Sequence, residues 1–238
     1  LRNALRTPSL LVHNARFWWH DETSSEAHIF VMGPPRSGTT LVQNVLQSHS
    51  EICGPESETW FFLRKDYTGF RHSSVPDSEM EQWIREADSV PDLFDRFAGA
   101  VKEREGGKQF LEKTPSHALQ MDYITSRFPK STVVFVVRDP RDCLRSAREH
   151  PIVWSNYPDD DRVGGYLNVW KRSVHAYLRN ESNPSVLLLR YEDFCRYPKE
   201  NLKKIAKHLG IEVQEHQLRP SSYGTANASE SETHRRLK

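Results

Sequence analysis

Apolar residues follow two different spacings along this chain. Nearly unbroken apolar runs occupy residues 29–32, 131–137 and 186–189. Short runs of this kind are typical of parallel strands that are buried on both faces. Elsewhere apolar residues recur every three or four positions, which predicts helices over residues 41–47, 93–104, 117–128, 163–179 and 198–209. This alternation of strands and helices predicts an α/β fold, with a parallel sheet flanked by helices.

Two segments interrupt the alternation. Residues 67–91 contain scattered Gly, Ser, Pro and charged residues, and we interpret them as an insertion that precedes the next helix. Residues 220–238 contain almost no apolar side chains, so we expect this tail to lie outside the core or to become ordered only over bound nucleotide. A chain of 238 residues can bury one full α/β core. We therefore predict a single domain over residues 1–238, with a core from about residue 27 to residue 212.

The loop between the first predicted strand and its helix has the composition of a phosphate-binding loop. Backbone N–H groups at the start of a helix, together with the helix dipole, bind phosphate. The segment from Gly33 to Gly38 fits the pattern Gly-x-x-x-x-Gly, but Thr39 stands where the nucleoside-triphosphate motif requires lysine. Arg36 is the only cation of the loop. A triphosphate with magnesium is therefore disfavoured, although a nucleotide or polynucleotide kinase is kept as an alternative.

Two further polar segments follow the second and third predicted strands. Arg138 directly follows the second strand, and the pair Asp139-Pro140 favours a turn that opens a helix. Ser146 lies eight residues after Arg138, about two helical turns along, so we expect these two side chains to converge. Tyr191 follows the third strand in the segment Tyr-Glu-Asp.

These three segments, in this order, resemble the sulfotransferases that use 3′-phosphoadenosine 5′-phosphosulfate (PAPS), with the closest motif similarity to protein tyrosine sulfotransferases and bacterial sulfotransferases. The resemblance covers about residues 29–210. It implies a P-loop NTPase-like fold of the sulfotransferase type. It also implies in-line transfer of a sulfonate group from PAPS, as co-substrate, to a hydroxyl or amine acceptor without a metal. The donor-binding residues that it implies are Pro35, Arg36, Ser37, Gly38, Thr39, Thr40, Arg138, Ser146 and Tyr191.

The same resemblance indicates catalytic residues. The segment Cys-Gly-Pro-Glu that ends at Glu56 is similar to Cys-Gly-Glu-Glu of the protein tyrosine sulfotransferases, with a gap of one residue, which makes Glu56 the preferred general base. Glu58 and His117 are the alternatives. Lys113 lies in Glu-Lys-Thr-Pro, which resembles the family's Lys-Asp-Pro, so Lys113 and Arg36 are expected to clamp the sulfonate.

One position departs from the family pattern. His150 stands where the tyrosine sulfotransferases have a second arginine for the 3′-phosphate. Either Arg145 or Arg148 replaces it, or that contact is missing.

Composition excludes some other functions. The 33 Lys and Arg residues nearly balance the 32 Asp and Glu residues, so nucleic acid is not an expected partner. The three cysteines have neither metal-ligand spacing nor the density of a disulfide scaffold. No apolar run reaches the length of a membrane span, and we expect a cytoplasmic protein, or a fragment of a longer or Golgi-type one.

Three questions stay open at this stage. The acceptor can be a small molecule, a carbohydrate or a peptide, because the aromatic residues of the variable segments suit all three. The oligomeric state is open. A catalytically idle nucleotide-binding domain is the third functional alternative, beside the sulfotransferase and the kinase.

Overall fold

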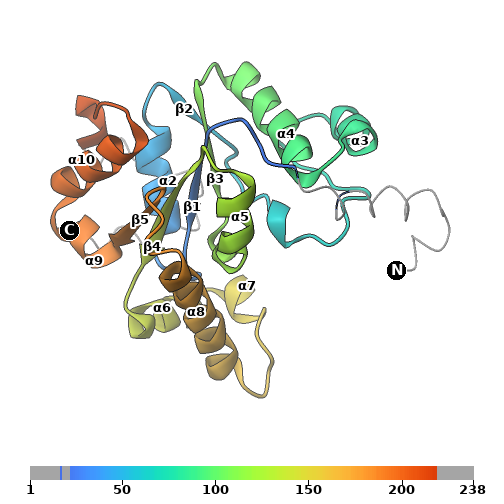
Figure 1. The fold of residues 1–238 in the computed structure, drawn as a ribbon. Helices are drawn as coiled ribbons and strands as arrows, with labels where there is room; N and C mark the ends of the chain where they lie inside the picture. Colours follow the sequence, from blue (N-terminus) through green and yellow to red (C-terminus); the bar gives the residue numbers. More distant parts are fainter. Residues whose placement is uncertain (1–16, 18–21, 219–238) are drawn as a thin grey trace.

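A five-stranded parallel sheet forms the centre of the fold (Figure 1). The computed structural model describes residue 17 and residues 22–218. Within them the strands are β1 (His28–Met32), β2 (Ile52–Cys53), β3 (Gln109–Lys113), β4 (Thr132–Val137) and β5 (Val186–Arg190). Their spatial order is β2-β3-β1-β4-β5, so β1 lies in the middle. All four pairings are parallel, with Ile29 opposite Leu111 on β3 and Val31 opposite Val134 on β4.

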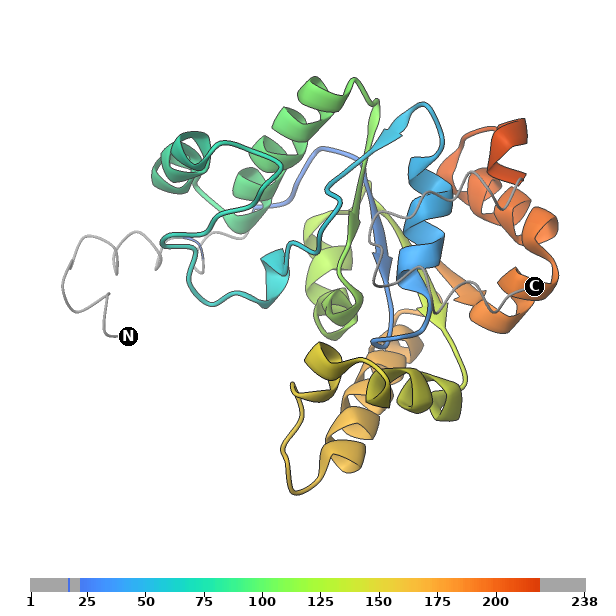
Figure 2. The ribbon, with the colours of Figure 1, turned by 180° about the vertical axis from the view of Figure 1, so that it is seen from behind.

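Helices cover both faces of this sheet (Figures 1 and 2). One face is covered by α2 (Thr39–Gln47), α9 (Tyr191–Arg196) and α10 (Pro198–Leu209). The other is covered by α3 (Asp77–Glu86), α4 (Val90–Glu105) and α5 (Met121–Arg127), together with the 3-10 helices η2 (Phe61–Leu63) and η3 (Pro115–Gln120). The remaining elements are α6 (Pro140–Arg148), α7 (Pro151–Trp154), α8 (Arg162–Arg179) and η4 (Glu215–Leu218). No helix in the described part of the chain is long and apolar enough to span a membrane.

Alternate residues of the central strands contribute to two separate cores. Phe30 and Met32 of β1 pack with the aromatic side chains of η2 and α4. Ile29 and Val31 point to the opposite face and pack with α2 and α10. Successive side chains of a strand point to opposite faces, so a strand covered on both sides needs an unbroken apolar run. The run at residues 29–32 therefore arises from burial on both faces.

The predicted α/β fold with a parallel sheet flanked by helices is confirmed, but several elements differ from the sequence interpretation. The helix predicted over residues 117–128 consists of the 3-10 helix η3 followed by α5. Residues 67–91, interpreted as an insertion, contain the helix α3. Only Met80 and Ile84 are buried on that helix, so its apolar pattern is sparse. The strand β2 has two residues, too few for a periodic pattern. The predicted polar tail, residues 220–238, lies outside the described residues.

The strand order determines where a ligand can bind. β3 lies on one side of β1 and β4 on the other, so the connections from the two neighbours diverge at the carboxyl end of β1. Open α/β sheets bind ligands in the crevice outside the carboxyl ends of strands at such a switch point. Both predicted phosphate-binding segments follow strands at this edge.

Candidate active site

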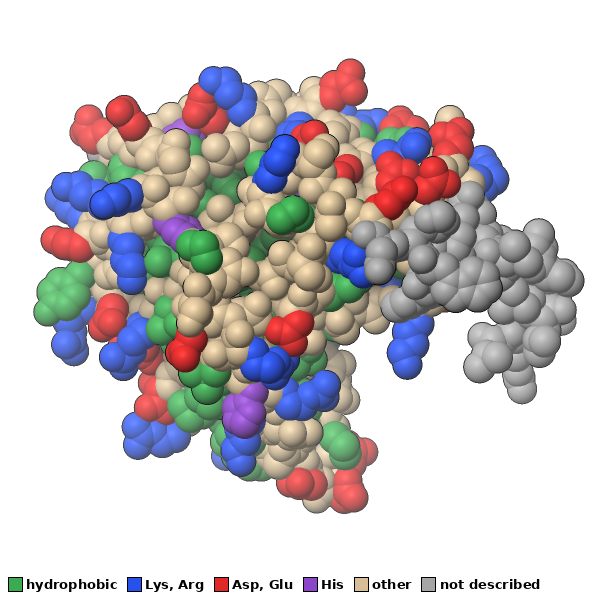
Figure 3. Space-filling view, viewed as in Figure 1, with side chains coloured by type: hydrophobic (Ala, Val, Ile, Leu, Met, Phe, Trp, Pro, Cys, Tyr) green, Lys and Arg blue, Asp and Glu red, His purple; other side chains and the backbone are tan. Residues whose placement is uncertain are grey.

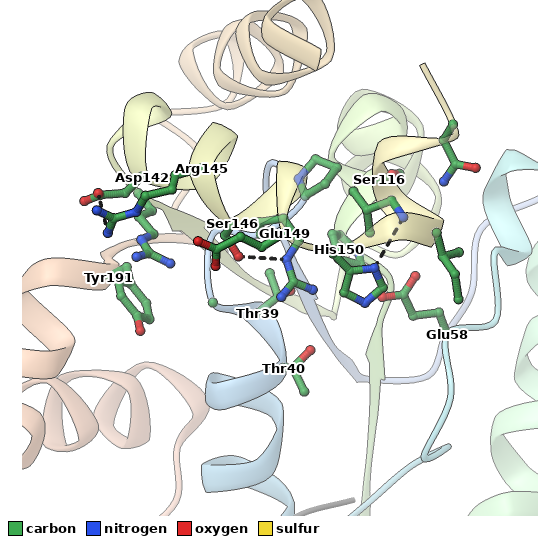
Figure 4. Close-up of a pocket in the computed structure, with 18 of the residues that line it drawn as sticks. Thr39, Thr40, Glu58, Ser116, Asp142, Arg145, Ser146, Glu149, His150 and Tyr191 are labelled. Carbon is green, nitrogen blue, oxygen red and sulfur yellow. Dashed lines mark hydrogen bonds and ion pairs between the residues drawn. The ribbon is translucent and has the colours of Figure 1, made fainter. Parts of the chain in front are cut away.

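A cavity of about 690 Å³ opens at the carboxyl ends of β1, β4 and β5 (Figure 4). Most of the residues predicted to bind the donor line it, although they come from three segments that are well separated in the sequence. These are Pro35, Arg36, Gly38, Thr39, Thr40, Arg138, Ser146 and Tyr191.

The loop that follows β1 is held from outside by α8. The Tyr166 hydroxyl donates a hydrogen bond to the carbonyl of Pro35 at 2.8 Å. Arg36 has a φ of 68°, and α2 then begins at Thr39 without a side-chain cap. The first N–H groups of a helix have no intrahelical acceptor, and the helix dipole makes this end positive. The opening of α2 is therefore suited to an anionic group in the cavity.

Ser37 is placed differently from its neighbours in the loop. Its side chain is fully buried and is not among the residues that line the cavity. Its backbone N–H donates to the carbonyl of Pro34 at 3.1 Å. Its hydroxyl has no hydrogen-bond partner among the described residues. The structure thus does not bring Ser37 to the cavity wall with Thr39 and Thr40.

Tyr191 connects the loop to the end of β4. Gly38 has a φ of 99°, and a Cβ atom on it would lie 2.2 Å from Cδ2 of the Tyr191 ring. The guanidinium carbon of Arg138 lies 4.5 Å from the centre of the same ring, within the range of a cation–π interaction. Burial raises the pKa of Tyr191, so its hydroxyl stays protonated at neutral pH. Position 38 therefore favours glycine for two reasons: its φ lies in the left-handed region, and the Tyr191 ring leaves no space for a Cβ atom.

The turn between β4 and α6 is fixed by two carboxylates. Asp139 accepts a hydrogen bond from the backbone N–H of Arg141 at 2.8 Å, and its own N–H donates to Glu192 Oε1 at 2.9 Å. The Arg141 side chain also donates to Asp139 and holds the pKa of that carboxyl at about 2. Farther along α6, Ser146 Oγ accepts a hydrogen bond from Arg36 Nε at 3.1 Å. The two predicted phosphate-binding segments are thus directly linked.

One face of α6 contributes more cavity residues than the sequence reasoning identified. Asp142 and Glu149 also line the cavity, at i−4 and i+3 from Ser146. Residues at these helical spacings share a face, so counting along the helix from Ser146 would have found them. Arg145 lines the cavity as well and pairs with Asp142 at 3.2 Å. Arg148 is exposed and does not line it.

The acidic candidates for the base are separated by the structure. Glu58 lines the cavity, and one of its oxygens accepts a hydrogen bond from Lys113 Nζ at 3.1 Å. Lys113 is 5% exposed and lies behind Glu58, outside the set of lining residues. Glu56, the base predicted from the sequence, is exposed and does not line the cavity. Trp60, two residues after Glu58, does.

His117 is buried away from the cavity. Its Nε2 accepts a hydrogen bond from the backbone N–H of Phe62 at 3.2 Å, and its Nδ1 lies 2.8 Å from Glu112 Oε2. The ring has no exposed surface and is not among the lining residues. Both nitrogens are engaged inside the protein, so the structure does not place His117 to receive a proton from an acceptor in the cavity.

Side chains of both charges mix on the surface, in line with the near-zero net charge. On the face shown in Figure 3, Lys and Arg side chains lie among Asp and Glu side chains. Among the described residues, no group of three or more His, Cys, Asp or Glu side chains is arranged to hold a metal ion. The three cysteines, Cys53, Cys143 and Cys195, are free thiols.

Comparison with known proteins identifies the family. The sequence model described as "Sulfotransferase family" matches residues 28–215, which include every element from β1 to the start of η4. The chain belongs to the sulfotransferase family. This membership confirms the resemblance that was inferred from the segments after β1, β4 and β5. It leaves the kinase alternative without support.

Individual sulfotransferases and related proteins are similar over most of this chain. The protein-tyrosine sulfotransferase of Drosophila melanogaster is 23% identical over 197 residues, which cover 77% of this chain and 38% of the relative. Nodulation protein NoeE of Sinorhizobium fredii is 32% identical over 230 residues, covering 82% of this chain and 55% of the relative. The chain therefore spans about half the length, or less, of these two curated relatives.

Solved sulfotransferase structures share the fold at low sequence identity. The sulfotransferase domain of the Synechococcus olefin synthase superimposes with a TM-score of 0.69 at 17% identity, covering 92% of this chain and 86% of that one. A mouse sulfotransferase complexed with PAP superimposes with a TM-score of 0.51 at 15% identity, covering 94% and 70% of the two chains. These likenesses support the sulfotransferase-type fold.

Proposed function

We propose that this protein transfers a sulfonate group from PAPS to a hydroxyl group of an acceptor. One observation supports the proposal most directly. The opening of α2, the side chains of Arg138 and Arg145, and the carboxylate of Glu58 all line a single cavity. Such a cavity combines groups that bind two separate phosphates with a group that can remove a proton. The solved mouse relative, which contains PAP, supports a donor of this kind.

The donor would contact two clusters of positive charge. The N–H groups at Thr39 and Thr40 and the side chain of Arg36 suit the 5′-phosphosulfate end. Arg138 and Ser146 suit the 3′-phosphate, and Arg145 is the cation that replaces the arginine missing at position 150. Charge-assisted hydrogen bonds of this type are shorter and about twice as strong as neutral ones.

Glu58, rather than Glu56, is the base in this proposal. Its carboxylate lies at the cavity wall, whereas Glu56 is exposed outside it. In the transfer, the acceptor oxygen forms a bond to sulfur, its proton passes to Glu58, and the bond from sulfur to the bridging oxygen breaks with its electron pair leaving on the phosphate. Arg36 stabilises the negative charge that develops there. Lys113 holds the Glu58 carboxylate at 3.1 Å.

The acceptor end of the cavity has apolar surface. Trp60 and Ile152 line it and are 43% and 72% exposed. This surface supports an acceptor with an apolar ring or chain next to its hydroxyl group. A peptide with a tyrosine is the first acceptor to test, because several relatives are named protein-tyrosine sulfotransferases. Phenols and sugars complete the acceptor panel.

A thermal-shift comparison tests donor recognition without an acceptor. At 100 times its dissociation constant, a ligand raises the unfolding free energy by about 2.7 kcal/mol. PAP should therefore raise Tm far more than adenosine 5′-phosphate at equal concentration. Arg138→Ala and Arg145→Ala should each raise the dissociation constant of PAP by about 10- to 150-fold. This change corresponds to roughly 1.5–3 kcal/mol, the contribution of a charged hydrogen bond. Arg148→Ala, on the same helix but outside the cavity, is the matched control.

Two results would contradict the donor assignment. If PAP and adenosine 5′-phosphate raise Tm equally, the protein does not recognise the 3′-phosphate. If Arg148→Ala lowers the affinity for PAP as much as Arg145→Ala does, the effect comes from a general loss of positive charge. In that case α6 makes no specific contact with the 3′-phosphate.

A further inference from the structure

A buried carboxylate directly precedes Lys113, the hydrogen-bond partner of the proposed base, on β3. Glu112 is the fourth residue of β3, is 1% exposed and does not line the cavity. An ionised group in the protein interior costs free energy unless its oxygens are fully hydrogen-bonded. The proposed reaction gives Glu112 no direct role, so its burial needs another reason.

Three side chains surround the Glu112 carboxylate. Oε1 accepts hydrogen bonds from the hydroxyls of Thr59 and Thr114, at 2.8 and 2.6 Å. Oε2 lies 2.8 Å from Nδ1 of His117. Thr59 belongs to the segment that contains Glu58, whereas Thr114 and His117 lie just after β3. Glu112 thus links two segments whose neighbouring residues, Glu58 and Trp60 in one and Pro115 and Ser116 in the other, line the cavity.

Each of these three side chains also accepts a hydrogen bond from a backbone N–H group. The three N–H groups belong to consecutive residues of the chain. Trp60 donates to Thr114 Oγ1 at 3.3 Å, and Phe61 donates to Thr59 Oγ1 at 3.2 Å. Phe62 donates to His117 Nε2 at 3.2 Å. One carboxylate therefore fixes three successive backbone positions through three different side chains.

The direction of the hydrogen bonds requires a carboxylate at position 112. Because Nε2 of His117 accepts the Phe62 N–H, the ring proton lies on Nδ1 and is donated to Glu112. Burial alone would raise the pKa of Glu112, but the hydrogen bonds donated by His117, Thr114 and Thr59 lower that pKa. A carboxylate is acceptor-only when ionised, so it satisfies all three donors. Glutamine would place an NH₂ group against one of them.

The segment held in this way is strained and functional in the proposed reaction. Trp60 has a φ of 54°, in the left-handed region that non-glycine residues rarely adopt. Strain of this kind persists only where surrounding contacts determine the backbone. Glu58 lies two residues earlier, and its partner Lys113 directly follows Glu112 on β3. Both members of the Glu58–Lys113 pair are thus adjacent to residues that the carboxylate fixes.

We propose that Glu112 is a positioning residue that, through Thr59, Thr114 and His117, holds Glu58 and Trp60 at the cavity wall without touching substrate. The inference rests on the proposed function, because it takes Glu58 as the base. A misplacement of about 1 Å in a reacting group can cost roughly 100-fold in rate. Loosening this network should therefore lower kcat and leave PAP binding unchanged.

Thr59→Val is the decisive variant, because valine keeps the shape of threonine but lacks its hydroxyl. We expect kcat, with PAPS and the best acceptor of the panel, to fall about 10- to 100-fold. The dissociation constant of PAP should stay within threefold of wild type. Thr59→Ser restores the hydroxyl and should restore kcat. Thr125→Val, whose hydroxyl bonds to Met121 in α5, is the control for a lost hydroxyl elsewhere.

A double mutant separates positioning from a general structural role. If Thr59 acts by placing Glu58, then Glu58→Gln with Thr59→Val should have the same kcat as Glu58→Gln alone, because no base remains to be placed. A further fall, or a loss of PAP affinity in Thr59→Val, would overturn the proposal. So would a wild-type kcat in Thr59→Val.

Hydrogen exchange keeps the test independent of the acceptor. In the ligand-free protein, Thr59→Val should speed amide exchange at residues 60–62 and leave the β3 amides unchanged. Unchanged exchange at residues 60–62 would refute the network. If Thr59→Val speeds exchange at residues 60–62 but PAP does not bind the protein, the proposed function is wrong. The role of Glu112 in holding this segment would still stand.

Discussion

Gly38→Ala tests the packing of the phosphate loop against Tyr191. The added methyl group would lie 2.2 Å from Cδ2 and 2.5 Å from Cε2 of the Tyr191 ring. Carbon atoms in contact are normally about 3.5–4.0 Å apart, so the ring or the loop must move. The ring is held on its other side by Arg138, and the loop by the Tyr166 hydrogen bond. Neither can move without loss of a contact that shapes the cavity.

Two costs add up in this variant. A non-glycine residue in left-handed backbone costs about 1–2 kcal/mol. Overpacking a well-packed site costs about 1–3 kcal/mol more. We therefore expect Gly38→Ala to lower the free energy of unfolding by roughly 2–5 kcal/mol. Gly106→Ala is the matched control, because Gly106 has a φ of 73° with nothing within 4 Å of the added atom. It should lose only about 1–2 kcal/mol.

Thermal unfolding measures the difference directly. For a domain of this size, 1 kcal/mol corresponds to roughly 2–4 °C in Tm. The Tm of Gly38→Ala should lie about 2–12 °C below that of Gly106→Ala, and its PAP affinity should fall as well. Equal losses of Tm in the two variants would refute the close contact between Gly38 and Tyr191.

Three other outcomes are expected. Glu58→Gln should lower kcat by about 10²- to 10⁴-fold with PAP affinity unchanged, and Glu56→Gln should leave kcat near wild type; the reverse result would restore Glu56 as the base. Asp139 has a lowered pKa of about 2, so its stabilising charge is present above its ordinary value of 3.8 and is lost as pH falls toward 2. Between pH 4 and 2, the Tm of Asp139→Asn, which keeps the helix cap, should fall less than that of wild type; parallel curves would contradict this. Burial raises the pKa of the Cys143 thiol to about 12, so mass spectrometry should find Cys143 unmodified by iodoacetamide at pH 8 in native protein and modified in denaturant.

Local pattern was sufficient to predict the strands β1, β4 and β5 and most of the main helices. The apolar run at residues 29–32 indicates a strand buried on both faces because side chains alternate along any strand. The loop from Gly33 to Gly38 indicates a phosphate because helix N-termini attract anions wherever they occur. These properties depend on neighbours in the sequence, so the sequence predicted them. α3 was missed because only two of its side chains, Met80 and Ile84, are buried.

The composition of the site depended on the tertiary structure. Arg36 and Ser146 are 110 positions apart, and only the pairing of β1 with β4 brings them to 3.1 Å. The sequence resemblance favoured Glu56 over Glu58 as the base, but the chain leaves Glu56 exposed and turns Glu58 toward Lys113. Glu112 has no sequence pattern of its own, because its partners come from two segments, after β2 and after β3, that meet only when β2 pairs with β3. Contacts of this kind depend on strand order and register, which the packing of the whole sheet determines and local spacing does not.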